Sequence, residues 1–131
     1  MNPIPMTESS QSESASKTLR RVNGDCCEET SLLTERKPDD SIVEEQLSVF
    51  KALSNSHRLR IVEALREGEL CACELQTILD APQSTVSSHL SELRDAGIVR
   101  TRQEGKWTYY RIADTASIQL LDLAAVLGKE K

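Results

Sequence analysis

The pattern of apolar and polar positions divides this chain near residue 41. The first 41 residues contain three prolines, five serines before residue 17 and almost no regular spacing of apolar side chains. Such a segment buries too little apolar surface to offset the conformational entropy that is lost on ordering. We therefore predict that residues 1–41 form a flexible acidic arm and that residues 42–131 form one folded domain.

The folded domain is predicted to begin with four helices. Apolar residues recur at steps of four and three, the spacing of one helix face, at Val43, Leu47, Phe50 and Leu53. Similar spacing predicts a second helix that ends near Gly68, a third that starts near Leu70, and a fourth that ends at Gly97. The turn Asp80-Ala81-Pro82 separates the third helix from the fourth, so this pair is arranged as a helix-turn-helix requires.

Two strands and a last helix are predicted after Gly97. Residues 98–102 and 106–112 are rich in β-branched and aromatic side chains, and Gly105 between them suits the left-handed position of a tight hairpin. Asp114 can cap a final helix that runs to Leu127. This helix is apolar on more than one side, which predicts packing against the same helix of a second copy. The predicted fold class is mostly α with a small β-hairpin, a dimeric winged helix-turn-helix.

The net charge of −5 belongs to the arm. Residues 1–45 hold five Lys and Arg against ten Asp and Glu, whereas residues 46–131 hold eleven of each. The acidic balance therefore does not argue against binding of nucleic acid by the domain. Residues 82–113, with five basic and three acidic groups, carry a local charge of +2.

The polar side of the fourth helix and the basic hairpin together predict DNA binding. Small polar side chains that can approach base edges in the major groove are Gln83, Ser84, Thr85, Ser87, Ser88 and His89. Two-residue alternation places Arg100 and Arg102 on one side of the hairpin, and Lys106 begins the returning strand, where these cations can hold phosphate. Any one of these residues alone is explained as well by a solvated surface, but their joint arrangement favours double-stranded DNA as the partner.

Residues 46–113 resemble the ArsR-type winged-helix repressors. The resemblance is carried, in order and spacing, by the segments LSNSHRLRIVEAL, ELCACEL, STVSSHLSELRDAGIV and GKWTYYRI. It implies a homodimer, joined through its first and last helices, that binds an operator and represses transcription. It further implies an inducer that weakens DNA binding.

Four cysteines carry the remaining chemistry. Cys71 and Cys73 lie at the predicted start of the third helix, where the helix dipole and free N–H groups are expected to lower thiol pKa values. In the first turn of a helix the two sulfurs can converge on one ion, and sulfur ligands select soft ions. Cys26 and Cys27 in the arm can supply a third or fourth sulfur.

The resemblance sharpens the expected metal site. The family's third-helix metal site uses a Cys-x-Cys segment, which Cys71 and Cys73 match. The cadmium/lead-sensing branch of the family adds cysteines of the N-terminal arm, a role that Cys26 and Cys27 can fill. The arsenite branch often has a further cysteine where this chain has Gln76. The inducer is therefore expected to be As(III) or Sb(III), or else cadmium or lead, with no metal required for DNA binding. A zinc site on the last helix is not expected, because that helix has no histidine.

Three alternatives remain open at this point. The regulator can respond to thiol oxidation, its cysteines can be incidental to DNA binding, or Cys71 and Cys73 can be small buried apolar residues. No Gly-rich phosphate loop and no supported Ser, His and Asp arrangement indicates an enzyme. The sequence contains no run of 18 apolar residues and no apolar leader, so we expect a cytoplasmic protein with no membrane partner and with reduced thiols.

Overall fold

The computed structural model describes residues 30–129. The chain divides into two units, residues 1–39 and residues 40–131, and α2 (Thr30–Thr34) belongs to the first. The elements of the second unit are α3 (Asp40–Leu53), α4 (Ser56–Ala64), the 3-10 turn η1 (Leu65–Glu67), β1 (Leu70–Cys71), α5 (Ala72–Leu79), α6 (Gln83–Asp95), β2 (Val99–Glu104), β3 (Trp107–Ile112) and α7 (Ala116–Lys129). No helix in the described part of the chain has the length and apolar character needed to cross a membrane.

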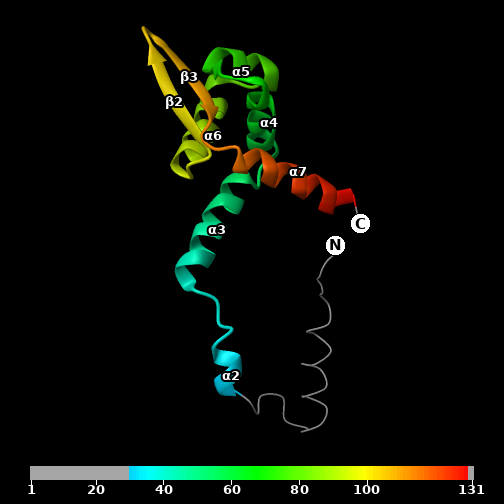
Figure 1. The fold of residues 1–131 in the computed structure, drawn as a ribbon. Coiled ribbons are helices and arrows are strands. Elements are labelled where there is room, and N and C mark those ends of the chain that lie inside the picture. The colour runs from blue at the N-terminus through cyan, green and yellow to red at the C-terminus, as the bar shows by residue number, and fades with distance from the viewer. Residues whose placement is uncertain (1–29, 130–131) are drawn as a thin grey trace. The chain divides into compact units, whose positions relative to one another are not determined.

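The core of the second unit lies between α4, α5 and α6, which gather in one cluster in Figure 1. Its least exposed side chains are Ile61, Val62, Leu75, Val86, Leu90, Leu93 and Val99. On α6 the buried residues are spaced by four and three positions, so one face of this helix is fixed against the core and the opposite face meets solvent. The inward positions of α6 are Val86, Leu90 and Leu93.

Local sequence signals set the ends of the central helices. The side chain of Asn55 caps α4, because its Oδ1 accepts hydrogen bonds from the backbone N–H groups of His57 at 2.9 Å and Arg58 at 3.2 Å. The turn between α5 and α6 begins at Asp80, which adopts a left-handed φ of 52°. Gly97, with φ 79°, follows α6 and turns the chain into β2. The predicted helix-turn-helix is confirmed in place, with its turn between α5 and α6.

The small sheet has three strands, not the two that the sequence predicts. Its order is β1-β3-β2, and β1 pairs with β3 in the register Leu70↔Tyr110 and Cys71↔Tyr109. The third helix accordingly starts at Ala72, and the expected start near Leu70 is wrong. A strand of two residues is too short to show periodicity, and its partner lies about forty residues further along the chain. No local sequence pattern therefore predicts it.

The hairpin of β2 and β3 projects beyond the helices in Figure 1. Its register runs from Val99↔Ile112 at the base to Glu104↔Trp107 at the tip, where Gly105 has the predicted left-handed φ of 63°. Val99 is buried and the other β2 residues are exposed, so the base is anchored in the core and the rest stands in solvent. We call residues 99–112 the wing.

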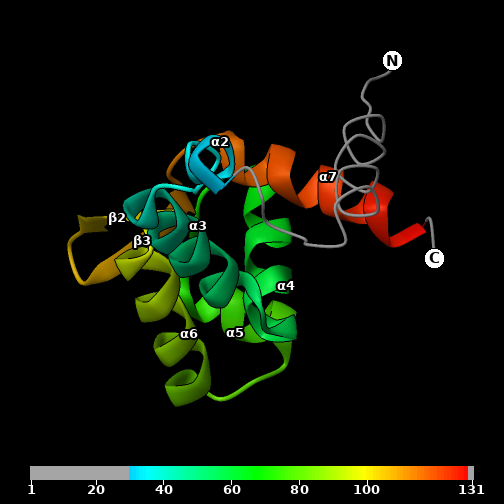
Figure 2. The same cartoon turned by 90° about the horizontal axis from the view of Figure 1, so that it is seen from below.

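The first and last helices of this unit leave apolar side chains uncovered. Figures 1 and 2 both show the C-terminal half of α7 extending away from the helix cluster. The exposed large apolar residues of these two helices are Ile42, Val43, Leu47, Phe50, Leu123, Val126 and Leu127. Asp114 Oδ1 accepts the Ala116 N–H at 2.8 Å at the start of α7, as predicted, but Gly128 lies inside the helix and does not end it.

Candidate DNA interface and thiol pair

The outward face of α6 is a stripe of serines. Ser84, Ser87 and Ser88, which the sequence predicts as DNA-reading residues, are exposed, as is Gln83, whereas Thr85 is half-buried. Ser91 is exposed and completes the spacing of three, four and seven residues from Ser84. Ser91 was missed from the candidate set, although helical periodicity alone points to it.

His89 has a contact inside the protein. Its Nδ1 accepts a hydrogen bond from Nε of Arg58 at 3.0 Å, and its ring centroid lies 5.4 Å from that of His57. Burial lowers the pKa of His89, and the charges of Arg58 and His57 lower it further. His89 is half-buried and neutral in this arrangement, so its Nδ1 is committed to holding α6 against α4.

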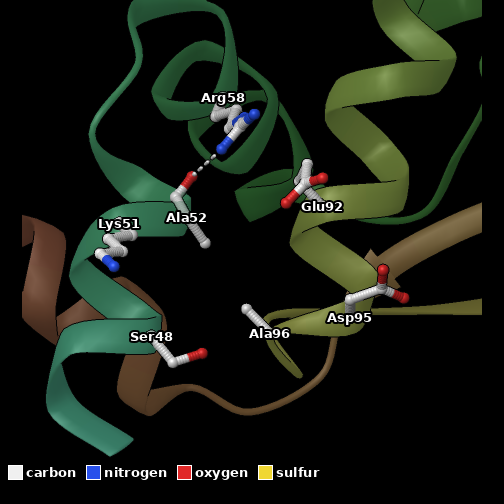
Figure 3. A pocket seen from close by; sticks show the side chains of 7 residues that line it. All are labelled: Ser48, Lys51, Ala52, Arg58, Glu92, Asp95 and Ala96. Atoms are coloured by element: carbon white, nitrogen blue, oxygen red, sulfur yellow. Dashed lines mark hydrogen bonds between the residues drawn. The ribbon is translucent and has the colours of Figure 1, made fainter. Parts of the chain in front are cut away.

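Arg58 also reaches the end of α3. Its Nη1 donates to the carbonyl oxygen of Ala52 at 3.4 Å, at the edge of a cavity of about 220 Å³. Figure 3 shows Glu92 and Asp95 of α6 on one side of this cavity and Lys51 of α3 on the other. One guanidinium therefore joins α3, α4 and α6.

Arg102 of the wing pairs with two carboxylates and one aromatic ring. Its Nε and Nη2 donate to the two carboxylate oxygens of Glu69 at 3.0 and 2.6 Å, and its Nη1 donates to Glu104 at 3.0 Å. The guanidinium carbon lies 4.7 Å from the ring centroid of Tyr109. The hydrogen bond from Arg102 lowers the pKa of Glu69, and the two carboxylates raise the pKa of Arg102.

The other predicted phosphate-holding cations are exposed. No ion pair within residues 30–129 involves Arg100 or Lys106. In the register of the wing Arg100 lies directly opposite Arg111, and both side chains are exposed. Two like charges in direct cross-strand positions repel each other unless an anion lies between them. Arg111 was not in the candidate set, although the hairpin turn fixes its position opposite Arg100.

The two thiols of the Cys-x-Cys segment meet at the start of α5. The Sγ atoms of Cys71 and Cys73 are 3.0 Å apart, with Cys71 buried and Cys73 exposed. Cys71 is the N-cap residue, and its backbone N–H donates to the carboxylate of Glu74 at 2.9 Å. The two sulfurs thus lie side by side, and their binding of one ion stays a prediction.

The prediction that the helix terminus lowers the thiol pKa values is wrong for Cys73. A hydrogen bond shared with Cys71 raises the pKa of the Cys73 thiol, and burial and the nearby Cys71 and Glu74 act in the same direction. The physical reason is that two sulfurs 3.0 Å apart resist carrying two negative charges. A backbone hydrogen bond lowers the pKa of Cys73, but it is the smallest of these influences.

The donor set in the described part of the chain fits only part of a soft-ion site. Within residues 30–129 no group of three or more His, Cys, Asp or Glu side chains is arranged to hold a metal ion. A tetrahedral ion with bonds of about 2.3 Å to sulfur separates two ligand sulfurs by roughly 3.7 Å, so the Sγ atoms of Cys71 and Cys73 would have to move apart to bind one. Cys26 and Cys27, the predicted further ligands, lie outside the described residues.

The chain is similar to curated bacterial regulators. The arsenic resistance transcriptional regulator ArsR1 of Pseudomonas putida is 48% identical over 65 residues, which are 49% of this chain and 51% of that protein. The cadmium resistance transcriptional regulatory protein CadC of Listeria innocua is 40% identical over 82 residues, 62% of this chain and 69% of that protein. The matched segment thus spans about half the length of the first relative.

Solved structures agree with the fold. Reduced HlyU from Vibrio cholerae is 32% identical with a TM-score of 0.61, and the match covers 67% of this chain and 93% of that one. A homodimeric winged helix-turn-helix DNA-binding domain from Mycobacterium bovis is 32% identical with a TM-score of 0.65, covering 72% and 89%. The model of the family described as "Bacterial regulatory protein, arsR family" matches residues 55–101. The predicted resemblance is confirmed: the chain has a winged helix-turn-helix fold and belongs to the ArsR family of transcriptional regulators.

Proposed function

We propose that this protein is a dimeric repressor that leaves its operator when a soft thiophilic ion binds its cysteine thiolates. The observation that carries this proposal is the pair of sulfurs 3.0 Å apart at Cys71 and Cys73. The pair begins α5, the helix that packs against the DNA-reading helix α6. A ligand at this position can therefore act on the DNA-binding elements from inside the same domain.

Sequence reading is assigned to the exposed side of α6. Gln83, Ser84, Ser87 and Ser88 are exposed and short enough to approach base edges, with Thr85 beside them at the half-buried margin. His89 positions the helix through Arg58, in addition to any contact its free ring edge makes. The wing supplies the grip on phosphate through Arg100 and Lys106, and through Arg102 once its carboxylate partners release it.

The dimer is proposed to form through α3 and α7. Their exposed apolar side chains, with Leu127 at 72% exposure, are expected to be covered by a second copy. Burying a fully exposed large apolar side chain contributes roughly 1.5–3 kcal/mol, and each of these partly exposed side chains contributes proportionately less. The homodimeric Mycobacterium bovis relative supports this assembly. A dimer presents two copies of α6 and predicts an operator with two half-sites spaced by whole turns of DNA.

The ion is proposed to bind Cys71 and Cys73 and to be completed by Cys26 or Cys27. The names of the relatives support arsenic or cadmium as the stimulus, because one is an arsenic and another a cadmium resistance regulator. As(III) or Sb(III) is satisfied by three sulfurs, whereas cadmium or lead accepts three or four. Thiolate ligands must lose their protons on binding, so ion affinity depends on pH.

The test is release of labelled operator DNA, followed by fluorescence anisotropy under reducing conditions. As(III), Sb(III), Cd²⁺ and Pb²⁺ are each added to the parent protein and to Cys71→Ser. We expect at least one ion to release the parent and none to release the variant. Equal release from both proteins would refute the thiolate sensor and leave DNA binding in place.

Thiol oxidation is the second candidate function. The 3.0 Å approach of the two sulfurs favours it, and one relative of known structure is described as reduced. Hydrogen peroxide would take two electrons and two protons from two thiols, giving one disulfide and two water molecules. The raised pKa of Cys73 weakens this alternative, because the thiolate is the reactive form. Release by peroxide that is reversed by a thiol reductant, without any effect of metal, would favour oxidation over ion binding.

A further inference from the structure

Two carboxylates already neutralise Arg102 in the arrangement described here, so it attracts a DNA phosphate less strongly than a free arginine would. All three of its guanidinium nitrogens donate to carboxylates, two of them to the same residue, Glu69, in a bidentate pair. Glu69 is 28% exposed and Glu104 is 68% exposed, so the Glu69 contact is the less hydrated of the two. The wing arginine is thus neutralised mainly by a residue outside the wing.

Glu69 lies next to the strand that carries the thiol site. It directly precedes β1, and β1 ends at Cys71. The cross-strand partner of Cys71 is Tyr109, whose ring lies against the guanidinium of Arg102. Cys71 is therefore connected to Arg102 in two ways. Glu69, two residues before Cys71, pairs with the guanidinium, and Tyr109, the cross-strand partner of Cys71, lies against it.

Glu69 also has space to move. A cavity of about 410 Å³ lies beside it, lined by residues of η1, the end of β3 and the start of α7. Arg111 lines the same cavity and contributes to the lowered pKa of Glu69 by its charge. A carboxylate that leaves Arg102 can therefore turn toward this cavity without disturbing the core.

We propose that Glu69 competes with DNA phosphate for Arg102 and so acts as a latch on the wing. In the free protein Glu69 holds the guanidinium, and on the operator a phosphate oxygen replaces the carboxylate. A ligand at Cys71 and Cys73 that fixes the end of β1 favours the latched state and weakens DNA binding. This inference rests on the proposed DNA binding, and its regulatory half rests on the proposed thiol site.

The latch is tested first without any ion, under reducing conditions. Operator affinity is measured against salt concentration for the parent, Glu69→Gln and the matched control Glu67→Gln, which removes the same charge two residues away. Glu69→Gln should bind several-fold more tightly at low salt, with a slope of log K against log salt steeper by about 0.9, the value for one more phosphate contact. Equal effects of the two variants, or weaker binding by Glu69→Gln, would overturn the proposal.

A double-mutant cycle and a DNA-free readout keep the test decisive. In an Arg102→Ala background, Glu69→Gln should no longer change affinity, and Glu69→Asp alone should fall between the parent and Glu69→Gln. In the free protein the Arg102 Nε–H resonance in a ¹⁵N NMR spectrum should move in Glu69→Gln and stay in place in Glu67→Gln. An unchanged resonance in Glu69→Gln would refute the latch even if the protein bound no DNA.

The ion is added last. If the thiol site works through the latch, the ion that releases the parent should release Glu69→Gln less effectively. Full release of Glu69→Gln would overturn the coupling of thiol to wing. An ion-free effect of Glu69→Gln together with a parent that ignores every ion would instead refute the sensor and leave the latch standing.

Discussion

Nε of Arg58 donates to Nδ1 of His89 at 3.0 Å, and this bond ties α6 to α4, the helix before the helix-turn-helix. The acceptor must be unprotonated, since a proton on Nδ1 would face a guanidinium N–H. Burial lowers the pKa of His89 for the same arrangement, with help from Arg58 and His57. The orientation of α6 is therefore linked to the charge state of one histidine.

The Arg58–His89 bond predicts a loss of stability on mild acidification. A histidine whose folded pKa lies below its unfolded value of about 6.5 binds fewer protons when folded. Its full contribution to stability is present above that value and is lost as pH falls through the folded pKa. The free energy of unfolding, measured by urea denaturation, should decline from pH 7.5 to pH 5. His89→Gln should show a smaller decline over that range than the parent. An identical decline in both proteins would contradict the assignment.

Substitutions in α6 should change the sequence preference of DNA binding, whereas substitutions in the wing should change its affinity for all sequences and its salt dependence. Ser87→Ala should relax sequence preference, at about 1–3 kcal/mol if it loses a base contact. Lys106→Ala should weaken all sequences alike and reduce the salt slope by about one, as expected for a lost phosphate contact. Competition between operator and unrelated DNA, measured at several salt concentrations, separates the two classes. Indistinguishable behaviour would show that these roles are wrongly divided between helix and wing.

The dimer is best tested at Leu127. This side chain is 72% exposed, whereas Leu121 on the same helix is 7% exposed and belongs to the core of the single chain. Leu127→Asp should therefore give folded monomers with much weaker operator binding, while Leu121→Asp would damage the fold itself. Gln119→Asp, at an exposed polar position, is the control. Sedimentation velocity that finds Leu127→Asp still dimeric would remove α7 from the interface.

Much of the DNA-binding unit follows from local sequence. A window of a few residues is enough to predict the turns at Gly97 and Gly105 and the buried face of α6. The strand at Leu70 and Cys71 cannot be predicted from such a window, because it exists only through its pairing with β3. The Glu69–Arg102 pair depends on that strand, and its partners are 33 positions apart in the sequence, so local patterns do not predict it either.

The same limit explains the error on Cys73. Sequence position places this thiol at a helix N-terminus, where isolated thiolates are stabilised. Its pKa is instead dominated by a neighbour, the Cys71 sulfur at 3.0 Å, whose distance depends on the backbone between β1 and α5. Spacing along a sequence indicates that two ligands can meet, but their separation and their mutual effect on ionisation require the folded geometry.

The raised pKa of Cys73 leads to the last prediction, which concerns pH and ion affinity. An ion that binds both sulfurs must displace the proton they share, because thiolates are the ligands. Binding should therefore release protons, and ion affinity should rise steadily between pH 6 and pH 8. Cys73→Ser should abolish release from the operator, since one sulfur cannot anchor the ion. Replacing Cys26 and Cys27 together should leave weak binding by the remaining pair with little release.

Ultraviolet thiolate-to-metal absorption measures ion binding at each pH. Calorimetry in two buffers of different ionisation enthalpy counts the protons that binding releases. Binding that is independent of pH would show that the sulfurs are already ionised and would contradict the shared-proton arrangement. Ion binding that survives Cys73→Ser unchanged would move the ligand site away from the start of α5.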